Sequence, residues 1–363
     1  MQRLHSPQEA ARWLHQRVSG RLCTDSRQVQ AGDAFLAWPG ARHDARRFVP
    51  EVLSRGASAC LVEEGDWAGW DDPAVHARSS DVAGYANLKA ASGPIAAAYF
   101  EHPSEAMDVL AVTGTNGKTS TAWWLAQALS KARAGRGQGG CGVVGTLGVG
   151  QPPQVQYTGL TTPDPVLMQG WFRRFADSGL TACAIEASSI GIVERRLDGT
   201  RIRVAVFTNF TQDHLDYHGD MAAYWQAKSA LFDWQDLAVA VINVDDPRGV
   251  ELVQRLQSRT SAPVEVWSCS SQGPARLQAR DIQQGGSVQE TCGHATGLSF
   301  EVVEGGQALR LHTSMVGLYN VNNLLGVIQN HAELVEMKLG AETKVTKNLS
   351  AIQQATMRAR DIV

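Results

Sequence analysis

The sequence lacks the features that mark several large classes of protein. Its six cysteines have no Cys-x-x-Cys spacing, which argues against a zinc site or a disulfide framework. No apolar run is long enough to span a membrane, and the first twenty residues carry charges and histidines instead of the apolar core of a signal peptide. The 33 basic residues are balanced by 36 acidic ones, so no surface for a nucleic-acid backbone is indicated. We therefore expect a cytoplasmic protein with reduced cysteines that binds neither membranes nor nucleic acid.

The most informative stretch reads Leu-Ala-Val-Thr-Gly-Thr-Asn-Gly-Lys-Thr-Ser-Thr-Ala, an apolar strand followed by a glycine-rich turn and the start of a helix. Gly114 and Gly117 let successive backbone N–H groups point inward, and the helix N-terminus adds positive potential. Lys118 can reach the outer phosphates, and the hydroxyl of Thr119 can hold Mg²⁺. The alternative is an ordinary strand–turn–helix junction, since a valine stands where the usual pattern has its first glycine. We predict an ATP-type site formed by Gly114, Thr115, Asn116, Gly117, Lys118, Thr119 and Ser120.

The chain has enough apolar sequence, 44% of 363 residues, for more than one domain with a substantial core. Residues 1–105 contain short strands and helices and predict a small α/β domain. Over residues 106–335, strand-like runs alternate with helices, which predicts an α/β domain with a doubly wound, mostly parallel sheet. Within it, residues 270–312 suit an antiparallel appendage, and residues 336–363 form an atypical tail. The strand-like runs are Val109 to Thr113, Thr181 to Ile185, Val204 to Thr208 and Ala238 to Ile242.

Polar side chains follow these strands where each one ends. Glu186 comes directly after one strand, and a carboxylate there can bind Mg²⁺, although a helix cap or a salt bridge is the alternative. His214 lies in the run Asp-His-Leu-Asp-Tyr-His-Gly-Asp after the next strand and can complete a metal shell or only fix the loop. Because the carboxyl ends of parallel strands meet at one edge of a sheet, we expect Lys118, Glu186, His214 and Lys228 to share one pocket.

Lys228 occupies an unusual place for a lysine. The helix that Asp220 caps puts it on the same side as Tyr224 and Phe232, in an apolar stripe. Either its stem packs while the ammonium escapes to water, or the lysine is altered or paired to serve the phosphate site. Further along, the run Gly-Leu-Tyr-Asn-Val-Asn-Asn over residues 317–323 opens a helix whose amides cap it or contact a ligand.

In this order the motifs resemble those of the Mur ligases, and most closely the MurE type, which adds the third amino acid to UDP-N-acetylmuramoyl-L-alanyl-D-glutamate. The similarity covers roughly residues 20–330. Asp25-Ser26-Arg27 resembles the signature of the family's first, UDP-binding domain, and residues 213–221 with Tyr224 and Lys228 form the most type-specific match. The resemblance implies ATP-dependent amide formation with Mg²⁺, in which a substrate carboxylate attacks the γ-phosphate and an amine then displaces phosphate from the acyl phosphate. The amine belongs to a diamino acid, meso-diaminopimelate or lysine, and we expect a monomer.

The resemblance also implies roles for single residues. Lys118, Lys228 and His214 are the implied catalytic residues, and Thr119, Glu186 and His214 the implied metal ligands. Carbamylation of Lys228 would turn its ammonium into a carboxylate-like oxygen ligand. The residues implied to hold the UDP part are Thr24, Ser26, Ala41, Arg42 and His43. Those implied to hold the muramoyl-peptide part are Thr161, Thr162, Ser188, Glu194 and Arg196.

The chain departs from the family pattern in three places. Ile190 and Glu194 stand where many relatives carry histidine and glutamine. Residues 331–363 differ from the family's passage into a third domain, which carries the amino-acid pocket, so we expect little or no turnover from this chain. Two other functions stay open: a non-catalytic module that binds nucleotide precursors, and another member of the wider group that includes the folylpolyglutamate and cyanophycin synthetases. The first domain argues against the latter, because those enzymes lack it in this form.

Overall fold

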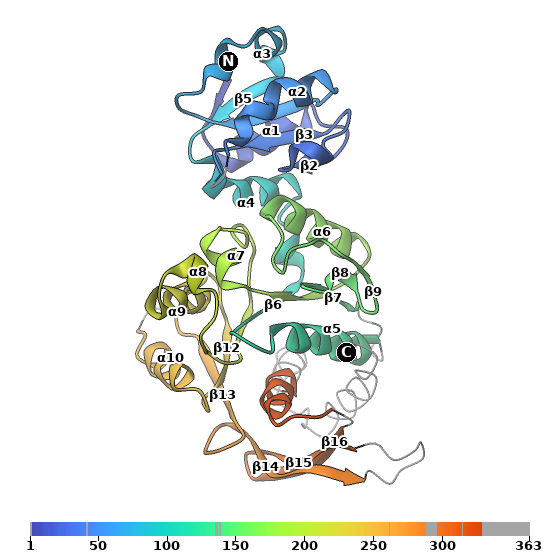
Figure 1. The fold of residues 1–363 in the computed structure, drawn as a ribbon. Helices are drawn as coiled ribbons and strands as arrows, with labels where there is room; N and C mark the ends of the chain where they lie inside the picture. Colours follow the sequence, from blue (N-terminus) through green and yellow to red (C-terminus); the bar gives the residue numbers. More distant parts are fainter. Residues whose placement is uncertain are drawn as a thin grey trace. The chain divides into compact units, whose positions relative to one another are not determined.

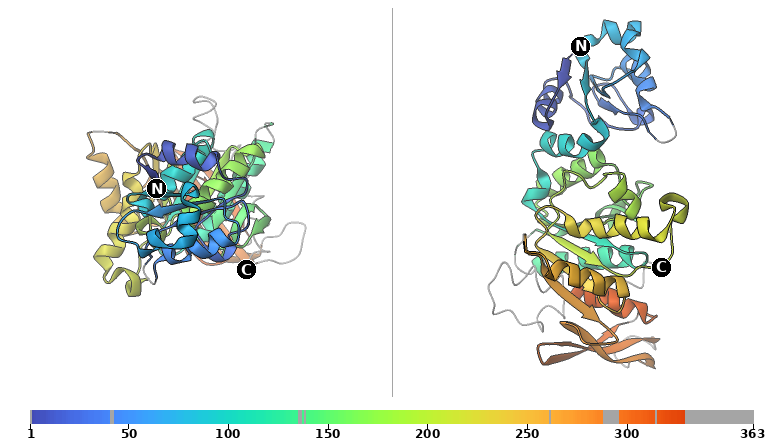
Figure 2. Two further views of the ribbon diagram at one scale, coloured as in Figure 1. Left: turned by 90° about the horizontal axis from the view of Figure 1, so that it is seen from above. Right: turned by 90° about the vertical axis from the view of Figure 1, so that its left-hand side faces the viewer.

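The computed structural model describes residues 2–40, 43–134, 137, 139–260, 262–287, 296–313 and 315–328. Ala41, Arg42 and residues 336–363, about which the sequence made predictions, lie outside the described residues. The described chain forms two compact units (Figures 1 and 2). Unit 1 comprises the described residues up to Ala106 together with Pro163–Ala176 and Val193–Thr200, and unit 2 comprises Met107–Thr162, Asp177–Ile192 and the described residues from Arg201 on.

Unit 1 is built on a sheet in the order β1-β5-β4-β3-β2, whose described neighbours all pair in parallel. Alternate strand residues face opposite sides, so Leu36 and Leu61 pack under α1 and α4, while Phe35 and Val62 pack under α2 and α3. The strands are β1 (Gln2–Leu4), β2 (Leu22–Cys23), β3 (Ala34–Ala37), β4 (Ala59–Glu63) and β5 (Val82–Tyr85). The helices are α1 (Pro7–His15), α2 (Val49–Ser54), α3 (Pro73–Ala77) and α4 (Leu88–Tyr99). The small α/β fold predicted at the N-terminus is confirmed.

Unit 2 contains a mixed sheet in the order β16-β15-β14-β13-β12-β11-β6-β10-β7-β8-β9. Neighbours from β14 through β6 to β7 pair in parallel, and antiparallel strands extend the sheet at both ends. This confirms the mostly parallel sheet and the antiparallel appendage. Its strands are β6 (Asp108–Thr113), β7 (Cys141–Gly145), β8 (Gly148–Gln151), β9 (Gln154–Gln156), β10 (Ala182–Glu186), β11 (Val204–Phe207), β12 (Val239–Asn243), β13 (Glu265–Ser270), β14 (Leu277–Ser287), β15 (Thr296–Glu304) and β16 (Gln307–Thr313).

Helices cover both faces of this sheet, which is why its central strands read as continuous apolar runs. On one face, α5 (Lys118–Ala134), which runs beside β6 and β7 in Figure 1, packs with a helical segment over 319–328 on Leu110 and Val112. On the other face, the ring of Trp225 in α9 (Met221–Ser229) makes an edge contact with Phe207, 5.5 Å between centroids. The remaining described helices of the chain include α6 (Pro165–Asp177), α7 (Ser189–Val193), α8 (Leu215–His218) and α10 (Pro247–Gln257). Among the described residues, no helix combines the length and apolarity needed to cross a membrane.

Candidate active site

The glycine-rich loop after β6 has a backbone that only glycine allows at two positions. Gly114 and Gly117 have φ values of +151° and +83°. A Cβ at Gly114 would collide with Oγ1 of Thr208, and one at Gly117 would collide with Oδ1 of Asn323. Thr208 also donates from Oγ1 to the carbonyl of Asn116 at 2.6 Å, which ties the loop to the end of β11. The loop is therefore fixed by Thr208 at the end of β11 and packs against Asn323 in the helical segment over 319–328. Such a rigid loop is expected for an anion-binding site.

Two lysine side chains converge on one carbonyl of this loop. Nζ of Lys118 donates to the carbonyls of Gly114 and Thr115, at 2.8 and 2.9 Å. Nζ of Lys228 donates to the same Gly114 carbonyl at 2.7 Å. Burial lowers the pKa of Lys118, while the nearby charge of Glu186 raises it. The amino groups of both lysines therefore lie together at the loop where phosphates would lie.

Glu186 lies beside the same loop at the end of β10. Its side chain is buried, with the residue 2% exposed, and it accepts a hydrogen bond from Oγ1 of Thr119 at 2.8 Å. Thr146 donates to it from its backbone N–H at 2.7 Å and from its hydroxyl at 3.3 Å. Burial raises the pKa of Glu186 despite these donors. A Cβ at Gly145 would collide with Oε1 of Glu186, so the close approach of β7 to this carboxylate requires glycine.

Lys228 is 1% exposed, so the alternative in which its ammonium escapes to water is wrong. The helix α9 begins after Asp220, whose side chain accepts from the N–H of Ala223, as predicted. Burial lowers the pKa of Lys228 to about 7, and the charge of Lys118 acts in the same direction. Its Nζ lies 4.4 Å from the ring centroid of Tyr224. At neutral pH a substantial fraction of this amine is uncharged and therefore nucleophilic.

His214 lies at the exposed edge of this cluster. Its side chain is 42% exposed, and its ring centroid lies 6.1 Å from that of Tyr224, the residue that also contacts Lys228. The second histidine of the loop, His218, is hydrogen-bonded through Nε2 to Oγ of Ser189 at 3.0 Å. The structure thus brings Lys118, Glu186 and Lys228 together around the loop, with His214 beside them.

Hydrogen bonds connect this cluster to residues predicted for the muramoyl-peptide part. Thr162 donates from Oγ1 to the backbone carbonyl of Glu186 at 2.7 Å and lies 2.9 Å from Oγ of Ser188. Oγ1 of Thr161 lies 3.1 Å from Oγ1 of Thr146, which itself binds Glu186. Unit 2 therefore holds these three predicted residues next to the phosphate loop.

The other predicted substrate residues that the structure describes lie in unit 1. Thr24, Ser26 and His43 line a cavity of about 580 Å³. Arg196 interacts with the carboxylate of Asp164, and Glu194 pairs with Lys89 at 2.7 Å. The described residues that line that cavity are Thr24, Asp25, Ser26, Arg27, Phe35, His43, Ala45, Phe48, Glu51 and Arg55.

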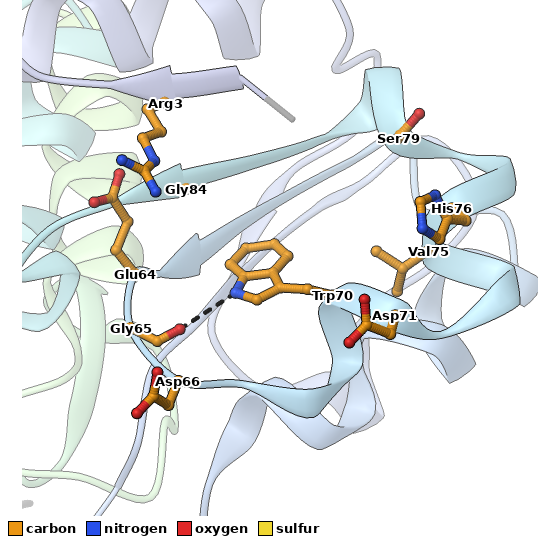
Figure 3. Close-up of a pocket in the computed structure, with 10 residues that line it drawn as sticks. All are labelled: Arg3, Glu64, Gly65, Asp66, Trp70, Asp71, Val75, His76, Ser79 and Gly84. Atoms are coloured by element: carbon orange, nitrogen blue, oxygen red, sulfur yellow. Dashed lines mark hydrogen bonds between the residues drawn. The ribbon is translucent and has the colours of Figure 1, made fainter.

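A second cavity of unit 1, about 600 Å³, contains none of the predicted residues (Figure 3). The indole of Trp70 borders it and donates to the carbonyl of Gly65 at 3.3 Å, as Figure 3 shows. Glu64 packs against Gly84, since a Cβ added at Gly84 would lie 3.0 Å from Cγ of Glu64. The described candidate residues Thr24, Ser26 and His43 line the other cavity of unit 1 instead.

The side-chain oxygens at the loop could supply part of the coordination shell of Mg²⁺. Thr119 and Glu186 supply a hydroxyl and a carboxylate 2.8 Å apart, and both are ligand types that Mg²⁺ prefers. Across the described ranges there is no group of three or more His, Cys, Asp or Glu side chains that could hold a metal. The donors therefore fit a cation that completes its shell with phosphate and water oxygens, which is the usual arrangement for Mg²⁺ with a nucleotide.

Replacement of Gly145 by alanine is expected to weaken Mn²⁺ binding in the presence of ATP by about tenfold, because the added methyl group displaces the carboxylate of Glu186. Electron paramagnetic resonance of free Mn²⁺ measures this affinity. Gly273→Ala is the matched control, since a Cβ there meets nothing within 4 Å. An unchanged Mn²⁺ affinity in Gly145→Ala would show that Glu186 does not serve the metal.

The fold and this loop define an α/β protein of the nucleotide-binding P-loop class. Residues 112–330 match the Mur ligase middle domain. The chain belongs to the Mur ligase family.

Similar proteins agree with this placement. The chain is 56% identical over 324 residues to the UDP-N-acetylmuramoyl-L-alanyl-D-glutamate–2,6-diaminopimelate ligase of Acidovorax sp. (strain JS42), covering 88% of this chain and 61% of that protein. A solved structure of a ligase of that name superposes with a TM-score of 0.72 at 26% identity, covering 92% of this chain and 62% of the other. The MurF ligase of Thermotoga maritima, solved with ADP, shares the fold, with a TM-score of 0.57 at 17% identity and coverage of 93% and 66%. The chain spans about three fifths of the length of the curated relatives it matches.

Proposed function

We propose that this chain belongs to a cytoplasmic ligase that joins a diamino acid to UDP-N-acetylmuramoyl-L-alanyl-D-glutamate, with ATP and Mg²⁺, in peptidoglycan precursor synthesis. The observation that carries the proposal is the convergence of Lys118 and Lys228 on the Gly114 carbonyl, next to the buried carboxylate of Glu186. The names of the most similar relatives favour diaminopimelate over lysine as the amino acid.

In this proposal the protein mainly positions groups and neutralises charge. The loop N–H groups and Lys118 hold the β- and γ-phosphates while the substrate carboxylate attacks the γ-phosphorus to give an acyl phosphate. Thr119 and Glu186 would hold Mg²⁺, which when bound offsets the charge of the transferring phosphoryl group. The neutral fraction of Lys228 can react with CO₂ to form a carbamate, whose oxygens would add a ligand that the ammonium cannot provide.

Each unit contains predicted substrate residues. We propose residues 1–105 as the UDP-binding domain, on the strength of the cavity around Thr24, Ser26 and His43. We propose residues 106–335 as the ATP-binding domain. Thr161, Thr162 and Ser188 would contact the muramoyl-peptide part. The hydroxyls of Thr161 and Thr162 are hydrogen-bonded to Thr146 and to the Glu186 carbonyl, and the hydroxyl of Ser188 lies 2.9 Å from that of Thr162.

Titration calorimetry tests the binding part of this proposal. We expect the chain to bind a non-hydrolysable ATP analogue with Mg²⁺ and, separately, the UDP-muramoyl dipeptide, both in the micromolar range. Phosphate release is then measured with ATP, the precursor and either meso-diaminopimelate or lysine. Failure to bind the UDP precursor would contradict the proposal, and binding of both ligands without any phosphate release would favour the non-catalytic binding module.

A further inference from the structure

Ser188 lies in the turn between β10 and α7, and its hydroxyl has a fixed hydrogen-bonding role. Thr162 donates its hydroxyl proton to the backbone carbonyl of Glu186 at 2.7 Å, since a carbonyl oxygen can only accept. The 2.9 Å contact between the hydroxyls of Thr162 and Ser188 must therefore use the proton of Ser188. Oγ of Ser188 also accepts from the N–H of Gly191 at 3.0 Å, in the first turn of α7. The Ser188 hydroxyl thus keeps one lone pair for a ligand and has no proton to offer it.

Backbone contacts hold one side of this turn in place. The N–H of Ser188 donates to Oγ1 of Thr162 at 3.2 Å, and the N–H of Ala187 donates to the carbonyl of Val112 at 2.8 Å. A Cβ at Gly191 would lie 2.7 Å from Cβ of Thr162, so the close approach of α7 requires glycine there. The turn is therefore fixed on the side that faces Thr162.

A side chain from a different loop reaches the residue that follows. Ser189 is 1% exposed, and its Oγ lies 3.0 Å from Nε2 of His218, which is a hydrogen bond whichever of the two atoms carries the proton. His218 ends α8, and its ring contacts those of Tyr217 and Tyr224, with centroids 5.0 and 5.1 Å away. These two rings restrict the direction in which the imidazole points. The hydrogen bond joins the loop after β11 to the turn between β10 and α7.

The loop after β11 is itself anchored to the phosphate loop. The N–H of Thr211 donates to Oγ1 of Thr115 at 2.9 Å, and the N–H of Thr115 donates to the carbonyl of Asn209 at the same distance. The N–H of His218 donates to the carbonyl of His214 at 3.0 Å. His218 therefore connects the phosphate loop to the turn between β10 and α7.

We propose that His218 is a positioning residue, which through its hydrogen bond to Ser189 places the free lone pair of Ser188 to accept a peptide N–H of the precursor. The inference rests on the proposed function, because it takes the precursor as the ligand. Phosphate and carboxylate oxygens do not match this lone pair, since they are acceptors themselves. Sugar hydroxyls could donate as well, and an analogue that lacks only the peptide N–H groups distinguishes the two.

Titration calorimetry with the UDP-muramoyl dipeptide and with its depsipeptide analogue, in which ester oxygens replace the two peptide N–H groups, tests the inference. We expect the wild-type chain to bind the analogue about tenfold more weakly, the effect of one lost hydrogen bond. His218→Phe keeps a ring but removes the bond to Ser189, and Ser189→Ala removes the same bond from the other side. Both variants should bind the dipeptide about tenfold more weakly and should no longer distinguish it from the analogue. The double variant should lose no more than either single one, because all three lack the same bond.

Ser130→Ala is the matched control, because Ser130 also joins two elements of unit 2. Its Oγ accepts from the N–H of Cys141 at 2.9 Å and so links α5 to β7. This variant should lower the melting temperature and keep the discrimination between dipeptide and analogue. Affinity for UDP alone should stay within about twofold of wild type in every variant, which shows that each is folded.

Two results would show that the inference is wrong while the proposed function stands. One is a tenfold discrimination that survives in His218→Phe and Ser189→Ala, since His218 would then not position Ser188. The other is equal binding of dipeptide and analogue by the wild-type chain, since no peptide N–H would then be recognised. If the wild-type chain does not bind the dipeptide at all, the proposed function fails and this inference fails with it.

Discussion

Replacement of Lys118 by methionine is expected to weaken binding of an ATP analogue with Mg²⁺ by about 100-fold. The ammonium lies at the Gly114 and Thr115 carbonyls beside the loop, and a charge-assisted hydrogen bond to phosphate contributes on the order of 3 kcal/mol. Methionine keeps most of the stem's volume, so the start of α5 should stay packed. Calorimetric titration of the nucleotide measures the change.

The matched control is Lys131→Met, an exposed lysine in the last turn of the same helix. It removes the same charge from α5 at a distance from the loop and should leave nucleotide affinity within about twofold, because exposed charges are screened by solvent. Equal loss of affinity in the two variants would mean that net charge, and not the loop, determines binding.

Replacement of Lys228 by methionine is expected to remove a large pH dependence from the stability of the chain. The folded-state pKa of Lys228, about 7, lies below the ordinary lysine value of 10.5, so the unfolded chain binds more protons between these two values. Wild-type stability should therefore rise as the pH increases from 7 toward 10, by roughly 3 kcal/mol from this group. Urea unfolding of both proteins in CO₂-free buffer measures the difference.

Below pH 7 the lysine is protonated in both states, so its unfavourable burial is fully present and the methionine variant should be the more stable of the two. Lys131→Met again serves as the control and should follow the wild-type pH dependence, since that side chain is exposed. If the unfolding free energies of wild type and Lys228→Met change with pH in the same way, the pKa of Lys228 is not lowered in the folded chain.

The same pair of proteins tests carbamylation. With ¹³C-labelled bicarbonate at neutral to mildly alkaline pH, the wild-type chain should show a carbamate carbon signal that Lys228→Met lacks, because carbamate forms from the neutral amine. A wild-type spectrum without that signal would leave Lys228 as a buried amine that acts only through its hydrogen bond to Gly114.

The parts of the site that follow strand ends could be predicted because their signals are local. Glu186 and the loop at Gly114 each come directly after an apolar run, and parallel strands bring such ends together. The position of Lys228 was predicted from helical spacing, but spacing cannot distinguish an ammonium in water from a buried one. Lys228 is only 1% exposed because its side chain contacts the ring of Tyr224 and the Gly114 carbonyl of the loop after β6. The second of these contacts is distant in the sequence.

Other parts depend on contacts that no local pattern reveals. Thr146 follows β7 like any turn residue, and its role appears only because Glu186, 40 positions later, accepts its hydrogen bonds. Glu194 reads as an ordinary surface carboxylate, and its partner Lys89, at 2.7 Å, lies 105 positions earlier in the sequence. Unit 1 likewise includes Pro163–Ala176 and Val193–Thr200, which contiguous sequence reading assigned to the second domain.

The central claim is that the loop at Gly114, Glu186 and Lys228 form one nucleotide–metal pocket. A crystal structure of the chain with a non-hydrolysable ATP analogue and Mn²⁺, phased to show the anomalous signal of manganese, tests it most directly. The account predicts a manganese peak within about 2.5 Å of oxygens of Thr119 and Glu186, with the terminal phosphates at Lys118. A nucleotide and metal bound away from these residues would contradict it.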